Sequence, residues 1–102
     1  HLLDSYPFPD FGKPVRYAGL KEAVSALHAR GKYVYSHIPS MMLLPSALRG
    51  MENWFVDHIL EKDALCRLLD LIVDARLTII EQYHAAGLDG VITWDDMGNN
   101  IL

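Results

Sequence analysis

Two short segments of β-branched and aromatic residues constrain the fold of this chain most strongly. Residues 32–38 read KYVYSHI and residues 88–94 read LDGVITW, and both compositions are typical of short strands. The long stretch between them carries apolar residues at helical spacing. Because parallel strands need a helical crossover of this kind and a hairpin does not, the sequence predicts an α/β fold of parallel β/α units.

Apolar spacing and glycine positions predict where the helices lie. One helix is expected from about residue 16 to a C-terminal cap at Gly31, and residues 40–60 are expected to form two short helices broken at Gly50. A long helix is expected over residues 63–86, with a glycine directly after it. The inward-facing residues of the second short helix are expected to be Trp54, Phe55, Ile59 and Leu60. The apolar face of the long helix is expected to comprise Leu65, Leu68, Leu69, Ile72, Ile79, Ile80 and Tyr83.

Two predicted strands are too few to complete a domain. Residues 1–15 are proline-rich and are expected to form a connector, and residues 16–102 are expected to form the β/α units. An isolated pair of parallel strands is marginal and leaves a sheet poorly covered. We therefore expect residues 1–102 to be a fragment of one larger α/β domain, as a first residue of His rather than Met also indicates. Taken alone, the chain is expected to associate, aggregate or melt non-cooperatively.

Charge and composition narrow the classes of partner. The net charge is −4, and the nine Lys and Arg residues are scattered along the chain. Phosphate backbones and anionic membrane surfaces attract clustered basic residues, so nucleic acid and membranes are not expected partners. No apolar run approaches the roughly 20 residues of a membrane span. The single cysteine, Cys66, excludes an internal disulfide and indicates a reducing, cytoplasmic setting, and we expect its side chain to be packed.

Polar residues follow both predicted strands at their carboxyl ends, where the loops of β/α barrels carry function. The candidate catalytic residues are Asp95 and Asp96, and the candidate substrate-binding residues are His37, Ser40, Asn99 and Asn100. Since successive residues of a strand point to opposite faces, we expect one of the two aspartates to face the barrel mouth and the other to cap a turn.

The chemistry of these residues leaves several alternatives open. The mouth-facing aspartate could serve as a general base, as an acceptor for a cationic or N–H group of a substrate, or as a metal ligand; the alternative is a solvated pair of loop carboxylates. His37 has a reference pKa near neutrality and could contact a substrate. The spacing of His and Cys provides no zinc site, so no metal is expected within these 102 residues. Arg49, before Gly50, could meet an anion or simply mark a helix break.

Four motifs in collinear order resemble the uroporphyrinogen decarboxylase superfamily. They are YPFPD, RYAGLKEAVSALHARGKYV, LRGMENWFVDHILEKDALCRLLDLIVD and AAGLDGVITWDDMG. The resemblance covers nearly all of the chain but only the middle of a longer family chain. It implies a (β/α)8 TIM barrel of which this chain is a part, with two parallel strands and their connecting helices.

The superfamily has two branches, and this chain departs from both. Decarboxylases of porphyrin and heme biosynthesis carry a tyrosine on the helix after the first strand, which residues 41–50 lack, and a serine close to where Asp96 stands. Residues 95–100, DDMGNN, are similar to the Asp-Asp-x-Gly-Thr-Gln loop of methyltransferase-like members, with Asn99 and Asn100 in place of Thr-Gln. The resemblance therefore favours the methyltransferase-like branch.

That branch implies particular partners. Its members act with a corrinoid protein on a small methylated substrate, usually with zinc, whose ligands would lie beyond Leu102. The 102 residues themselves are expected to bind no cofactor and to be inactive alone, with zinc belonging to the full-length parent enzyme. The alternatives are a uroporphyrinogen decarboxylase and a truncated, inactive fragment or binding module. A homo-oligomer is compatible with each of these alternatives.

Overall fold

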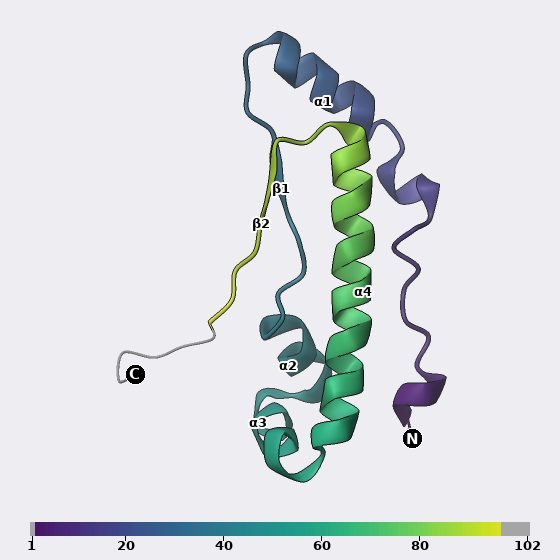
Figure 1. Ribbon diagram of the computed structural model, residues 1–102, viewed down its shortest axis with the longest axis vertical. Helices are drawn as coiled ribbons and strands as arrows, with labels where there is room; N and C mark the ends of the chain where they lie inside the picture. The colour runs from purple at the N-terminus through teal and green to yellow at the C-terminus, as the bar shows by residue number, and fades with distance from the viewer. Residues whose placement is uncertain (1, 97–102) are drawn as a thin grey trace. The chain divides into compact units, whose positions relative to one another are not determined.

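The structure is a computed structural model that describes residues 2–96 (Figure 1). It is a mixed α/β structure, mostly helical, with two parallel strands. The elements in chain order are the 3-10 helices η1 (Leu2–Ser5) and η2 (Pro14–Tyr17), α1 (Leu20–Ala29), β1 (Tyr35–His37), α2 (Leu43–Arg49), α3 (Met51–Leu60), α4 (Lys62–Ala86) and β2 (Gly90–Ile92). The order of helices and strands confirms the sequence prediction.

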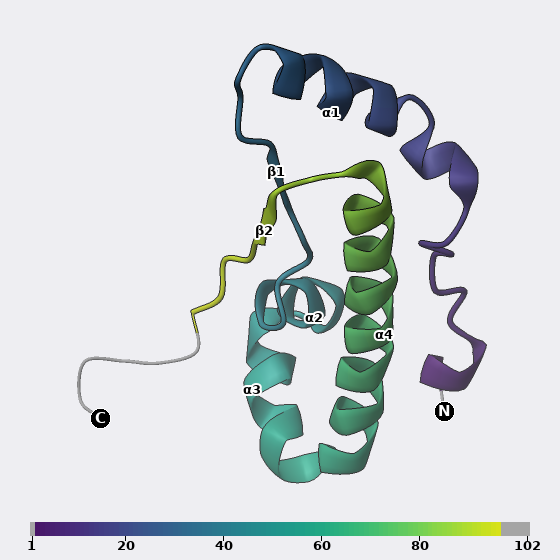
Figure 2. The same cartoon turned by 45° about the horizontal axis from the view of Figure 1, so that its top comes forward.

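The strands β1 and β2 pair in parallel, as the helical crossover requires. Tyr35 lies opposite Gly90 and His37 opposite Ile92, and the strands run side by side in Figure 1 and Figure 2. Each strand is three residues long, which is shorter than the seven-residue segments predicted from composition. Before the strands, the Asp89 amide donates to the Val34 carbonyl at 2.8 Å, while the Val34 amide donates to the Asp89 side chain, also at 2.8 Å.

The described chain divides into two compact units. One contains residues 2–8, 39–74 and 94–96, and the other contains residues 9–38 and 75–93. The boundary falls within α4, after Asp74. The first unit thus holds α2, α3 and the first half of α4, and the second holds α1, both strands and the second half of α4.

A stripe along α4 forms the core of both units. Its buried residues recur every three or four positions, which keeps them on one side of a helix. They are Leu65, Leu68, Ile72, Ala75 and Ile79. Ile72 is completely buried, and Leu69, Ile80 and Tyr83 are half-buried, so the predicted face is largely confirmed. Cys66 lies outside this stripe and is exposed, so the prediction that it packs is wrong.

Glycines end two helices in the same way. Gly31 has φ of 68° and Gly87 has φ of 89°, a left-handed conformation that costs glycine least. After α1, the Lys32 amide donates to the Leu27 carbonyl at 3.1 Å, and after α4 the Leu88 amide donates to the Tyr83 carbonyl at 3.0 Å. These bonds satisfy carbonyls that a helix end would leave without partners. Each helix therefore stops directly before a strand segment.

The two short helices meet at Gly50, as predicted, but α3 presents an unexpected face. Gly50 has φ of 82° and forms the break between α2 and α3. Trp54 is buried, whereas Phe55, Ile59 and Leu60 are 57%, 83% and 72% exposed. The prediction that these three residues face inward is therefore wrong. The inward side of α3 instead carries the buried side chains of Trp54 and Asp57, which are described below.

Candidate functional site

Ser40 and Asp95 are brought into direct contact, although 55 residues separate them in sequence. The Ser40 hydroxyl donates to Oδ1 of Asp95 at 2.5 Å. The same Oδ1 accepts the Met42 amide at 3.0 Å. Ser40 follows β1 in the chain and Asp95 follows β2, so two predicted site residues do converge. Both residues are half-buried and both belong to the first unit.

The pair holds the start of α2. The Ser40 Oγ accepts the Leu43 amide at 2.8 Å and the Met42 amide at 3.2 Å. The first amides of a helix have no carbonyl partners within the helix, and here a hydroxyl and a carboxylate supply them. A charge-assisted bond to a carboxylate is stronger than a neutral one. Asp95 is therefore a positioning residue whose carboxylate fixes the polypeptide after both strands.

Asp96, the other predicted catalytic aspartate, is exposed. The two neighbouring carboxylates thus differ in environment, one half-buried in a hydrogen-bond network and the other open to solvent. Asn99 and Asn100, predicted to bind substrate, lie outside the described residues. The expected cap on the turn after Asp96 also lies outside them, whereas the observed cap formed by Asp95 is on α2.

His37 lies on β1, in the second unit. Its imidazole is exposed, and its ring meets the Tyr35 ring edge-to-face with centroids 6.3 Å apart. Ser36, between them, donates its hydroxyl to the Tyr83 hydroxyl of α4 at 3.3 Å. Because alternate strand residues face opposite sides, His37 and Tyr35 share the face of β1 that points away from α4.

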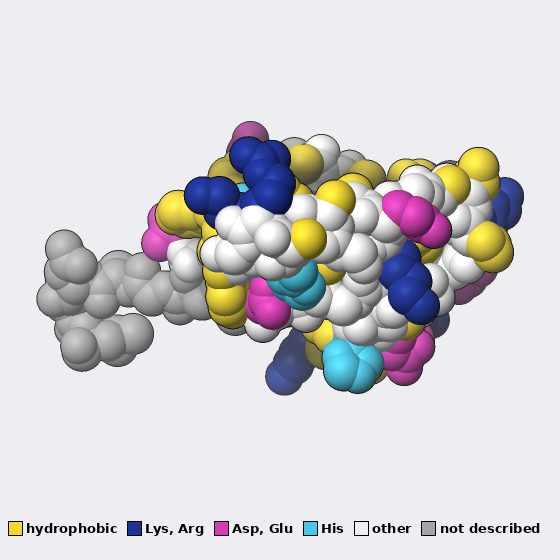
Figure 3. Space-filling view, turned by 90° about the horizontal axis from the view of Figure 1, so that it is seen from above, with side chains coloured by type: hydrophobic (Ala, Val, Ile, Leu, Met, Phe, Trp, Pro, Cys, Tyr) yellow, Lys and Arg dark blue, Asp and Glu magenta, His cyan; other side chains and the backbone are white. Residues whose placement is uncertain are grey.

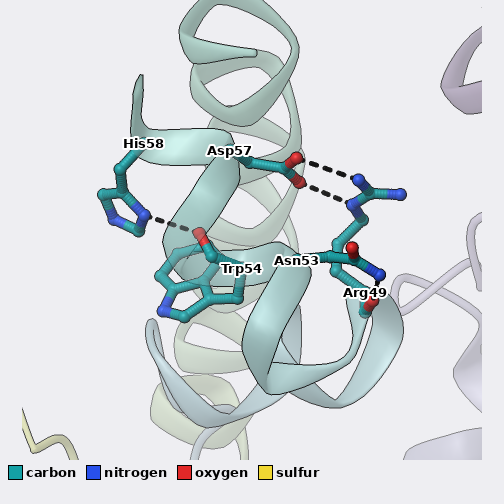
Figure 4. Close-up of polar contacts among 5 residues, drawn as sticks. All are labelled: Arg49, Asn53, Trp54, Asp57 and His58. Atoms are coloured by element: carbon teal, nitrogen blue, oxygen red, sulfur yellow. Dashed lines mark hydrogen bonds and ion pairs between the residues drawn. The ribbon is translucent and has the colours of Figure 1, made fainter. Parts of the chain in front are cut away.

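A bidentate ion pair joins α2 to α3, and sequence spacing gave no sign of it. Arg49 donates to the two carboxylate oxygens of Asp57 at 2.6 and 2.9 Å (Figure 4). The Asp57 side chain is 9% exposed, and the two hydrogen bonds from Arg49 hold the pKa of its carboxyl below the usual range. The guanidinium is thus engaged by a carboxylate from its own unit. The alternative that Arg49 marks a helix break, rather than an anion site, agrees with this geometry.

Two further contacts belong to the Arg49–Asp57 cluster. The Asn53 side chain donates to the Arg49 carbonyl at 3.0 Å, and the His58 Nδ1 lies 2.7 Å from the Trp54 carbonyl (Figure 4). The rings of Trp54 and His58 also meet edge-to-face. The Asn53 bond joins α3 to the end of α2, and the His58 contact links neighbouring turns of α3. The cluster therefore has a structural role.

A second cluster missed by the sequence lies where both strands begin. His28 Nε2 lies 2.7 Å from Oδ2 of Asp89, and Tyr33 donates its hydroxyl to the Asp89 carbonyl at 3.0 Å. The pKa of the Asp89 carboxyl is lowered, mainly by the hydrogen bond from the Val34 amide and to a smaller extent by the hydrogen bond from His28. In parallel β/α folds this end of the strands serves stability rather than chemistry. We therefore assign the cluster to the joining of α1 with the strands.

Charged side chains form no visible single-sign patch on the face drawn in Figure 3. Figure 3 shows basic and acidic side chains interspersed on the face that it displays. Among the described residues, no group of three or more His, Cys, Asp or Glu side chains could hold a metal ion. Within that same part of the chain, no helix is long and apolar enough to cross a membrane.

No family model, curated protein or solved structure matches this chain. Function is therefore inferred from the contacts of Ser40 and Asp95 and from the sequence motifs.

Proposed function

We propose that this chain is part of a (β/α)8 barrel enzyme of the uroporphyrinogen decarboxylase superfamily. Within it, the chain belongs to a methyltransferase-like member that acts with a corrinoid protein on a small methylated substrate. The motifs quoted above motivate the family. The contact between Ser40 and Asp95, which joins the segments after both strands, is the observation that supports a site at this end of the sheet.

The backbone arrangement supports the barrel part of the proposal. β1 and β2 are adjacent and parallel, and three helices lie between them in the chain. In a β/α barrel, strands of this kind are neighbours in a closed sheet, and the residues after their carboxyl ends line the mouth. Ser40 and Asp95 occupy such positions. Further strands of the parent enzyme would complete the sheet.

The two aspartates have separate roles in this proposal. Asp95 holds the start of α2 and keeps the segment after β2 in place, through Ser40 and the Met42 amide. Asp96 is the exposed neighbour and acts as the acceptor for a cationic or N–H group of the substrate. A rigidly held loop presents its next residue in a defined position, which is what orientation of a substrate requires. His37, in the second unit, and Asn99 and Asn100, outside the described residues, are proposed substrate-binding residues on their sequence positions alone.

The described residues do not fit the zinc that the superfamily branch usually carries. A catalytic zinc ion needs about three protein ligands, and no such group converges among residues 2–96. The residues described here are therefore assigned no role in binding zinc. If the parent enzyme binds zinc, the ligands come from its other segments.

Methyl transfer by the purified parent enzyme tests the proposal. The enzyme is incubated with a small S-methyl thioether as the methylated substrate and a reduced, unmethylated corrinoid protein, and the methylated corrinoid and the released thiol are measured. We expect Asp96→Asn to lower kcat/KM about 10- to 100-fold, since a hydrogen bond to a charged group is worth about 1.5–3 kcal/mol. The matched control is Asp74→Asn, which replaces an exposed aspartate on α4 and is expected to leave kcat/KM unchanged.

The same protein is also incubated with uroporphyrinogen. Formation of coproporphyrinogen, without methyl transfer, would replace the proposal by the decarboxylase alternative. An enzyme that performs neither reaction, while folded, would favour a binding module. Equal loss in the Asp96 and Asp74 variants would remove Asp96 from the site.

A further inference from the structure

We draw no further inference here: the strongest candidate, the exposed apolar face of α3 around Phe55, Ile59 and Leu60, carries none, because nothing among residues 2–96 shows what covers it.

Discussion

The contact between Ser40 and Asp95 predicts a local loss of order when Asp95 is replaced. Oδ1 of Asp95 accepts two hydrogen bonds, from the Ser40 hydroxyl and the Met42 amide. Hydrogen bonds to a charged group contribute about 1.5–3 kcal/mol each when they are buried. Because the carboxylate is half-buried, water replaces part of this, and we expect Asp95→Ala to lower the local opening free energy by about 2 kcal/mol. That corresponds to an increase of about 30-fold in the open population.

Native-state hydrogen exchange measures this effect at single amides. The Met42 and Leu43 amides, which donate to Asp95 and Ser40, are expected to lose about 30-fold in protection in Asp95→Ala. The Lys32 amide, bonded to a carbonyl at the end of α1, is expected to keep its protection and serves as an internal reference. This readout does not require the chain to unfold in one cooperative step.

Two further variants make the measurement decisive. Asp96→Ala removes the adjacent, exposed carboxylate and is expected to leave the Met42 and Leu43 amides unchanged. Ser40→Ala is expected to resemble Asp95→Ala, and the double variant is expected to cost less than the sum, because the two residues share one network. Unchanged protection in Asp95→Ala, or equal loss in Asp96→Ala, would refute the assigned roles of the two aspartates.

Three other predictions concern stability. Ile72→Ala is expected to lower the free energy of unfolding of the parent protein, measured by urea denaturation, by about 2–5 kcal/mol. The control Leu77→Ala, at an exposed position, is expected to lower it by less than about 1 kcal/mol. Equal losses would contradict the assignment of the core. Arg49 lowers the pKa of Asp57, so the ion pair stabilises the fold fully above the ordinary aspartate pKa range and less as pH falls through the lowered pKa. Arg49→Met should therefore reduce the slope of unfolding free energy against pH below about 4. An identical slope would show that the pair takes no part in acid unfolding. Gly87→Ala is expected to cost about 1–2 kcal/mol through its φ of 89°, and a stability equal to wild type would show that α4 does not need glycine there.

Local chemistry explains which parts of the fold were predictable. Gly31 and Gly87 end their helices through the conformation of one residue and bonds to the preceding turn, so a short window of sequence contains the whole cause. The parallel pairing of β1 and β2 follows from the length of chain between them. The lengths of the strands were not predictable from composition, because regular pairing is confined to residues 35–37 and 90–92 and depends on contacts between segments 55 residues apart.

The orientation of α3 was mispredicted for a physical reason. Apolar residues lie on most of its circumference, so periodicity alone does not choose the buried side. Asp57 turns inward because Arg49 on the preceding helix neutralises it with two hydrogen bonds. Trp54 is buried on that side and Phe55 is exposed. A bond between two helices decided the outcome, and no helical spacing rule contains it.

The sequence placed Ser40 and Asp95 after the two strands, where the structure brings them into contact, but it did not predict the bonds that they form. The rule that function follows strand ends selected Ser40 and both aspartates. Asp95 and Asp96 differ in exposure, but both lie beyond β2, which ends at Ile92, so strand alternation does not explain the difference. Neither rule could say that Asp95 would bond to the start of α2, because that contact depends on how the segments after both strands meet.

The Ser40–Asp95 contact also sets an order of events during synthesis. Ribosomes add about 5–20 residues per second, so Asp95 is made about 3–10 s after Ser40, 55 residues earlier. Until then the first amides of α2 have the Ser40 hydroxyl but not the carboxylate. The residues that end α1 at its C-terminus, Gly31 and its backbone partners in the preceding turn, are made long before Asp95. A newly made chain therefore passes through a stage in which the groups that cap α1 are all present and the start of α2 still lacks the Asp95 carboxylate.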